Sequence, residues 1–189
     1  DGEELTALPD KKLAALRLRR LGFVFQQPRL LASLSLRDNV SLPGLLARAE
    51  SRGVIARRTD ELLETMEVAG VADHLPSRVS GGQLQRASIC RALVNGARTV
   101  MGDEPTGALN RAAAEQVLGL LGRVHRQGRS LVIVTHDAQV AARADRVLAL
   151  VDGVVVTDLE LGECPRDYGE EARAERVGAV AEAMAQLGV

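Results

Sequence analysis

Short runs of apolar residues alternate along the chain with longer segments in which apolar residues recur at helical spacing. The short runs predict buried strands over residues 21–26, 99–102, 131–135 and 147–151. The longer segments predict helices over residues 55–68, 80–95, 110–128, 138–144 and 170–187. Residues 1–20 and 30–53 are expected to be irregular. Buried strands alternating with helices are typical of an α/β fold with a largely parallel sheet.

Polar residues at the helix ends support these boundaries. Ser80 is followed three residues later by Gln83, the pattern of a capping box. Asn110 is expected to cap the next helix. After the last strand, the pair Asp152-Gly153 predicts a tight turn between the two arms of a hairpin.

The composition is that of a globular protein without bulk charge. Of the 189 residues, 46% are hydrophobic and 26% charged, and the net charge of −1 gives no positive field for nucleic acid. Aromatic residues make up 2%, which leaves no stacking platform for single-stranded bases. No apolar run approaches the roughly 18 residues of a membrane-spanning helix. Cys90 and Cys164 are far apart and in no metal-ligand spacing, so we expect a reduced, cytosolic chain.

Two adjacent carboxylates, Asp103 and Glu104, follow the apolar run 99–102. Parallel α/β folds bind ligands at the carboxyl ends of their strands. Asp103 could hold Mg²⁺ there, directly or through water. Glu104 is expected to point elsewhere because successive strand residues alternate, and it could polarise an attacking water. Alone, the pair is also compatible with an acidic turn that ends a strand.

The motif Ser80-Gly81-Gly82-Gln83 opens a predicted helix. A helix N-terminus presents unpaired N–H groups and partial positive charge, and two glycines let a phosphate approach the backbone. The Ser80 hydroxyl could donate to the same anion. The alternative is an ordinary capped helix without a ligand.

Two further polar side chains follow predicted strands. Gln26 ends the run 21–26, and a neutral amide there could contact both a metal ion and an attacking water. His136 follows the strand 131–135, and its ring could hydrogen-bond a terminal phosphate. A surface or capping role is the simpler interpretation of a single histidine in a loop.

Taken together, these residues resemble the ABC (ATP-binding cassette) ATPase family over most of the chain. Their order is similar to that of the family's Q-loop (Gln26), signature motif (Ser80–Gln83), Walker B aspartate and catalytic glutamate (Asp103 and Glu104) and H-loop (His136). The resemblance implies an α/β, P-loop NTPase-like fold in which a mostly parallel sheet is flanked by helices.

The resemblance also implies a domain organisation. Residues 1–161 would form a partial ABC ATPase domain that lacks its first strands, with a helical signature subdomain over about residues 30–97. Residues 162–189 would be a C-terminal helical appendage. Asn110 stands where the family's D-loop usually has Asp, which keeps an N-cap but weakens the charge of that loop.

ATP and Mg²⁺ are the cofactors that the resemblance implies. Glu104 and His136 would be catalytic, and Asp103 and Gln26 would bind Mg²⁺. The expected nucleotide-binding residues are Gln26, Asn110 and, across a head-to-tail dimer, Ser80, Gly81, Gly82 and Gln83 of the signature motif. The implied partners are a second ATPase subunit and a transmembrane permease, which would hold the chain at the inner face of the cell membrane.

Softer similarities indicate a branch of the family. The sequences GFVFQQ at 22–27 and DEPTGALN at 103–110 look like those of exporters of the lipoprotein-release and macrolide-efflux type. Such a subunit would power export through a separate permease. A non-transport ATPase of the cell-division type shares these features, and a degenerate, non-catalytic subunit is a further alternative. The permease would choose the substrate, so the substrate is not readable from this sequence.

The family's phosphate-binding loop (Walker A, G-x-x-x-x-G-K-[ST]) has no counterpart in this sequence. Its only lysines are Lys11 and Lys12, and Pro9-Asp10 precedes them in place of a glycine loop. Because the first residue is Asp1 rather than Met, we expect a fragment of a longer subunit. This chain alone is expected not to hydrolyse ATP.

Overall fold

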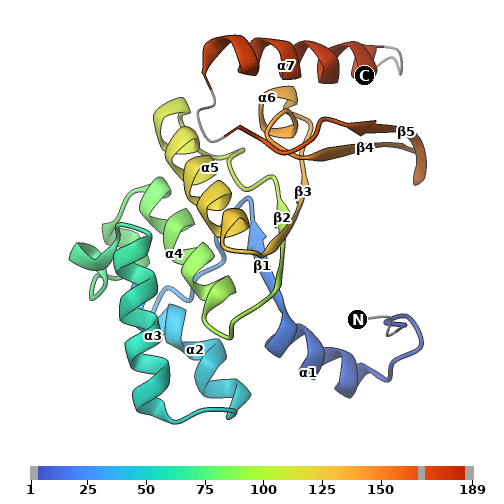
Figure 1. Ribbon diagram of the computed structural model, residues 1–189. Helices are drawn as coiled ribbons and strands as arrows, with labels where there is room; N and C mark the ends of the chain where they lie inside the picture. Colours follow the sequence, from blue (N-terminus) through green and yellow to red (C-terminus); the bar gives the residue numbers. More distant parts are fainter. Residues whose placement is uncertain (1–3, 166–168, 186–189) are drawn as a thin grey trace. The chain divides into compact units, whose positions relative to one another are not determined.

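The computed structural model describes residues 4–165 and 169–185. The chain forms two compact units, one ending at Val134 and the other beginning at Thr135. Figure 1 shows the helices and strands of each unit. The predicted domain boundary between residues 161 and 162 stays a prediction.

The first unit is built on a parallel sheet with the strand order β1-β2-β3. These strands are β1 (Leu21–Phe25), β2 (Thr99–Asp103) and β3 (Ser130–Val134). In the register, Phe25 lies opposite Asp103, and Asp103 lies opposite Val134. The three strands therefore end level, and the residues that follow them emerge at one edge of the sheet. The predicted parallel α/β arrangement is confirmed.

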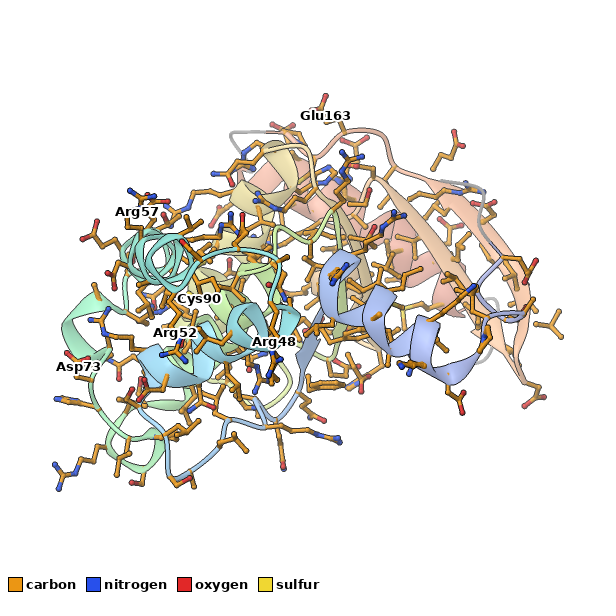
Figure 2. All side chains as sticks on the ribbon, turned by 90° about the horizontal axis from the view of Figure 1, so that it is seen from below. Arg48, Arg52, Arg57, Asp73, Cys90 and Glu163 are labelled. Carbon is orange, nitrogen blue, oxygen red and sulfur yellow. The ribbon has the colours of Figure 1, made fainter. Side chains whose placement is uncertain are left out.

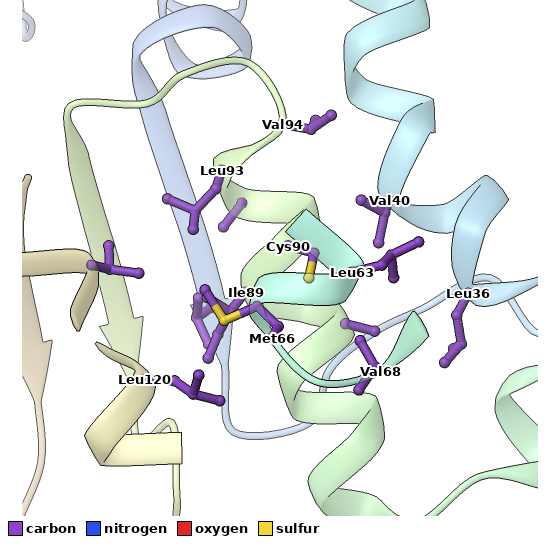
Figure 3. Close-up of a cluster of buried hydrophobic side chains, with 14 of the residues drawn as sticks. Leu36, Val40, Leu63, Met66, Val68, Ile89, Cys90, Leu93, Val94 and Leu120 are labelled. Carbon is purple, nitrogen blue, oxygen red and sulfur yellow. The ribbon is translucent and has the colours of Figure 1, made fainter. Parts of the chain in front are cut away.

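The α-helices described in this unit are α1 (Asp10–Arg20), α2 (Leu36–Ala47), α3 (Arg52–Thr65), α4 (Gly81–Leu93) and α5 (Arg111–Arg126), with short 3-10 turns at Ala69–Val71 and Pro76–Arg78. The central helix is α4, which packs on β1, α2, α3 and α5. Its Ile89 and Leu93 are buried together with Leu36, Leu63 and Leu120 from neighbouring helices (Figure 3). Each such side chain stabilises the fold by roughly 1.5–3 kcal/mol through burial.

Two helices occur where the sequence was expected to be irregular. No residue of α1 is buried, and its Leu13, Leu16 and Leu18 are only half-buried, so the apolar stripe of this helix is weak. Asp10 in its first turn and arginines in its last turn suit the helix dipole. Helix α2 contains Pro43. Because proline usually breaks a helix, the sequence pattern did not predict a helix here. Ser35 caps α2, and its buried face includes Leu36 and Val40, so packing outweighs the proline.

The second unit contains α6 (Ala138–Ala141), the antiparallel strands β4 (Arg146–Val151) and β5 (Val154–Glu160), and α7 (Glu170–Ala185). Asp152 and Gly153 have φ values of 50° and 78°, as a two-residue hairpin turn requires. The predicted hairpin is confirmed. The predicted last helix is confirmed as far as Ala185, and its final residues, 186–187, lie outside the described residues.

Arg176 joins α7 to the rest of the second unit. Its side chain is buried and donates to the carbonyl oxygens of Ala142 (2.8 Å), Ala144 (2.6 Å), Leu161 (2.8 Å) and Gly162 (3.1 Å). Helix α7 is therefore an integral part of this unit.

Candidate functional site

Asp103 and Glu104 lie at the carboxyl end of β2. Asp103 is the last strand residue and is exposed. Glu104 has φ of 43°, a left-handed conformation that costs a non-glycine residue roughly 1–2 kcal/mol. Its N–H donates to the carbonyl oxygen of Val134 (2.9 Å). Because β2 ends at Asp103, this backbone conformation, and not strand alternation, sets the direction of Glu104. Such strain is typical of functional sites.

Gln26 is the first residue after β1, and its side chain reaches the turn that begins at Glu104. The Gly107 N–H donates to the Glu104 carbonyl oxygen (3.0 Å) and closes that turn. A Cβ atom added to Gly107 would lie 2.8 Å from Gln26 Nε2 and 3.4 Å from Gln26 Cδ. The structure therefore brings Gln26 together with the Glu104 turn. The Gln26 side chain is exposed, so a ligand can reach it.

The signature residues form the first turn of α4. The Gln83 N–H donates to Ser80 Oγ (3.3 Å), and the Ser80 N–H donates to Gln83 Oε1 (2.8 Å). This pair is the predicted capping box. The Ser80 hydroxyl only accepts in it and keeps its own proton for an anion. Gly81 and Gly82 are the first two residues of the helix, where N–H groups have no partner within the helix itself. The cap thus orders this turn and leaves donors for a phosphate.

The signature glycines lie against the start of α5. A Cβ atom on Gly81 would be 3.6 Å from Leu109 Cδ2, and one on Gly82 would be 3.2 Å from Ala113 Cβ. Asn110 caps α5 as predicted, because its Oδ1 accepts the Ala113 N–H (2.9 Å). The D-loop residue is therefore held beside the signature motif.

His136 lies in the second unit, between the end of β3 at Val134 and α6. Its side chain is exposed. On either side, Thr135 Oγ1 accepts the Asp137 N–H (3.1 Å), and Asp137 Oδ1 accepts the Gln139 N–H (2.8 Å). These bonds order the loop that presents His136.

The carboxylate and amide oxygen ligands at the sheet edge suit Mg²⁺. The described residues include no group of three or more His, Cys, Asp or Glu that could hold a metal. Mg²⁺ keeps several waters and is usually bound through one or two carboxylates together with substrate phosphates. The Asp103 carboxylate and the Gln26 amide therefore fit a Mg²⁺ ion that arrives with a nucleotide, and they do not form a complete cage.

The two lysines do not form a phosphate-binding loop. Lys11 and Lys12 are exposed residues of α1, and a helix has its N–H groups directed along its own axis. None of the 189 residues belongs to a G-x-x-x-x-G-K-[ST] sequence. None of the described helices has the length and apolar character needed to cross a membrane.

Three residues near the site were missed by sequence reasoning: Gln85, Arg91 and Gly107. Gln85 did leave a signal, because it stands one turn before Ile89 and two turns before Leu93 on the buried face of α4. A polar residue there demands a partner. The contact between Gly107 and Gln26 joins segments that are distant in sequence, so it left no signal in the sequence.

Most of the length of this chain is similar to parts of known proteins. A family model described as ABC transporter matches residues 1–107. The macrolide export ATP-binding/permease protein MacB 1 of Aeromonas hydrophila is 47% identical over 157 residues, which cover 83% of this chain and 24% of that protein. MacB of Neisseria meningitidis serogroup B is 43% identical over 158 residues, 84% of this chain and 24% of that protein. This chain therefore spans about a quarter of the length of these relatives.

Solved structures show the same relationship. The dimeric, post-hydrolysis state of the ATP-binding cassette MJ0796, bound to ADP and Pi, has a TM-score of 0.76 and 36% sequence identity. That comparison covers 85% of this chain and 71% of the cassette. The fold is thus the P-loop NTPase-like α/β fold that the sequence predicts. Since the family model matches more than half of its residues, the chain belongs to the ABC transporter family, as an ATP-binding domain of the ABC ATPase type.

Proposed function

We propose that this chain is the signature-bearing and catalytic part of an ATPase subunit that drives export through a membrane permease. Its relatives are named macrolide export ATP-binding/permease proteins. The related cassette is dimeric and holds ADP and Pi. The proposed partners are a second ATPase subunit and a permease, and the proposed location is the cytoplasmic face of the membrane.

The level edge of the β1-β2-β3 sheet is the observation that carries this proposal. It places Asp103 beside Glu104, and Gln26 against the turn that Glu104 opens. A carboxylate for a metal, a second carboxylate for a proton and an amide for a water are the groups that phosphoryl transfer to water uses.

The proposed roles follow from the chemistry of each group. Asp103 and Gln26 hold Mg²⁺, which when bound neutralises phosphate charge. Glu104 orients the attacking water and accepts its proton. The His136 ring donates to the terminal phosphate.

The signature motif acts on the nucleotide of the second subunit in this proposal. The Ser80 hydroxyl and the N–H groups of Gly81 and Gly82 donate to its γ-phosphate, and Asn110 lies next to the same nucleotide. Hydrogen bonds to a charged group contribute about 1.5–3 kcal/mol each. ATP would therefore hold two subunits together, and hydrolysis would release them.

The role of Glu104 is tested by Glu104→Gln in the full-length protein. The change keeps the shape and removes the proton acceptor, so the hydrolysis rate should fall by roughly 10²–10⁴-fold. Dimers should accumulate with MgATP in size-exclusion chromatography. Glu64→Gln, at an exposed position of α3, is the matched control. Undiminished phosphate release from Glu104→Gln would exclude this role.

A second candidate is a non-catalytic chain that lends its signature motif to an intact partner. It is favoured by the lack of a glycine-rich phosphate loop in these residues. Titration of the 189-residue chain into a complete ABC ATPase should then stimulate hydrolysis to saturation, and no stimulation would count against it. A neighbouring gene for a permease with a large extracytoplasmic domain would favour export over a cell-division function.

A further inference from the structure

Side chains of α4 hold the backbone on both sides of Gln26. Gln85 Nε2 donates to the carbonyl oxygen of Phe25 (3.0 Å). Arg91 donates to the carbonyl oxygens of Pro28 (2.6 Å) and Arg29 (2.8 Å). The helix that begins with the signature motif is thus bonded to the loop that carries Gln26.

The burial of the Gln85 side chain costs free energy. It is 1% exposed, and its Oε1 has no partner in the described part of the chain. An unsatisfied buried polar atom costs about 1–3 kcal/mol, a cost that an apolar side chain of the same size would avoid. Stability alone therefore does not account for glutamine here. Its bond to Phe25 is what an apolar side chain could not supply.

The loop after β1 depends on Arg91. Arg29 has φ of 47°, a left-handed conformation that persists only where the surroundings impose it. The Arg91 guanidinium is part of these surroundings, because it donates to the carbonyl oxygens of Arg29 and of the residue before it. Arg91 is partly buried as it makes these bonds, and this burial lowers its pKa.

The strand below the loop lies in close contact with α4. A Cβ atom on Gly22 would lie 2.6 Å from the Ala92 carbonyl oxygen, so β1 and α4 meet backbone to backbone. This contact, together with the hydrogen bonds of Gln85 and Arg91, connects α4 with β1 and with residues 25–29.

We propose that Gln85 and Arg91 are positioning residues that couple the signature motif to Gln26. When a γ-phosphate pulls on Ser80, α4 carries the Gln26 segment with it. A change imposed on that segment reaches the signature motif by the same bonds. This inference rests on the proposed function, since it links two parts of the proposed ATP sites.

The first test measures the bonds without any nucleotide. Hydrogen exchange in the full-length protein is compared between wild type, Gln85→Met, Arg91→Met and Arg91→Lys. The amides of residues 26, 27 and 29–31 should exchange roughly tenfold faster in the two methionine variants. Arg91→Lys keeps the charge but loses the two separate nitrogens that donate to the two carbonyl oxygens, so it should be intermediate. Arg57→Met, at an exposed position of α3 (Figure 2), should match wild type. Unchanged exchange at 26–31 would overturn the inference.

The second test measures coupling. In the methionine variants kcat for ATP hydrolysis should fall about five- to tenfold, with KM for ATP changed less than twofold, since Gln26 is misplaced and nucleotide binding is kept. An equal loss in Arg57→Met, or kcat unchanged in both methionine variants, would overturn the coupling. A wild-type protein without ATPase activity would refute the proposed function, and the exchange test would still decide whether the bonds exist.

Discussion

At the scale of single residues, the position of Gln26 depends on the absence of a side chain at residue 107. The Gln26 amide occupies the space that a Cβ atom of Gly107 would need. Gly107 does not have the left-handed backbone that only glycine favours. An alanine there would therefore disturb Gln26 and not the backbone.

We predict that Gly107→Ala lowers ATP hydrolysis about tenfold in the full-length protein, because the Gln26 amide must leave its place. The melting temperature should change by less than about 2 °C, since the displaced group is the end of a flexible side chain. Gly53→Ala, where a Cβ atom meets nothing within 4 Å, is the control. Normal activity in Gly107→Ala would show that this contact has no role.

Gly102 shows a related effect in β2. A glycine inside a strand usually weakens it. In the structure Gly102 is buried, and its Cβ position lies 2.7 Å from Ile133 Cδ1 and 3.5 Å from Pro105 Cγ. The missing side chain gives room to these neighbours, so the glycine allows close packing beneath Asp103.

At the scale of helices and strands, Cys90 reports on the contact between α3 and α4. Its thiol donates to the Leu62 carbonyl oxygen (3.3 Å), and its side chain lies in the cluster of Figure 3. Burial raises the pKa of this thiol to about 12. In the unfolded chain the pKa is about 8.5.

A thiol reagent at pH 8 should therefore modify Cys164, which is half-buried, and leave Cys90 unmodified until the protein unfolds. The raised pKa also fixes the sign of the pH dependence. The contribution of the buried Cys90 thiol to the free energy of unfolding is fully present below pH 8.5 and is lost as the pH rises toward the folded-state pKa. The free energy of unfolding should fall by about 1.4 kcal/mol per pH unit between roughly pH 9 and 12. Denaturant titrations at pH 8 and 10 measure it, and rapid native labelling of Cys90 would contradict this packing.

Arg176 has a comparable role in the second unit. Arg176→Met should lower the stability of this unit by on the order of 3 kcal/mol, because several carbonyl oxygens lose a charged donor. Hydrogen exchange of residues 142–162 measures this effect. Arg146→Met removes only an exposed pair with Asp158 and should cost less than about 1 kcal/mol. Equal effects would show that α7 is held by other contacts.

Sequence patterns predicted some elements well and others not at all. The capped helices α4 and α5 and the β4-β5 hairpin carry their signals in adjacent residues, such as Ser80 with Gln83 and Asp152 with Gly153. Helix α1 has no buried face, and α2 is held by the core despite Pro43. Tertiary packing decides such helices, and a local pattern does not contain it.

At the scale of the whole molecule, the order of the motifs predicted the family, and the geometry of the site required the structure. Sequence reasoning found Gln26, Asp103 and Glu104, and their roles remain proposals. It could not find the left-handed backbone of Glu104 or the bonds from α4 to the Gln26 loop. These features join segments that are far apart in the chain.

The central claim is that the signature motif of one subunit completes the ATP site of another. Two inactive full-length variants test it: Glu104→Gln, which lacks the proton acceptor, and Ser80→Arg, which blocks the signature motif. In a mixed dimer, the intact Glu104 of one chain faces the intact Ser80 of the other. Mixing should therefore restore ATP hydrolysis to about a quarter of the wild-type rate, because half of the dimers are mixed and each has one working site. No recovery, with mixed dimers demonstrated by pull-down, would contradict the account.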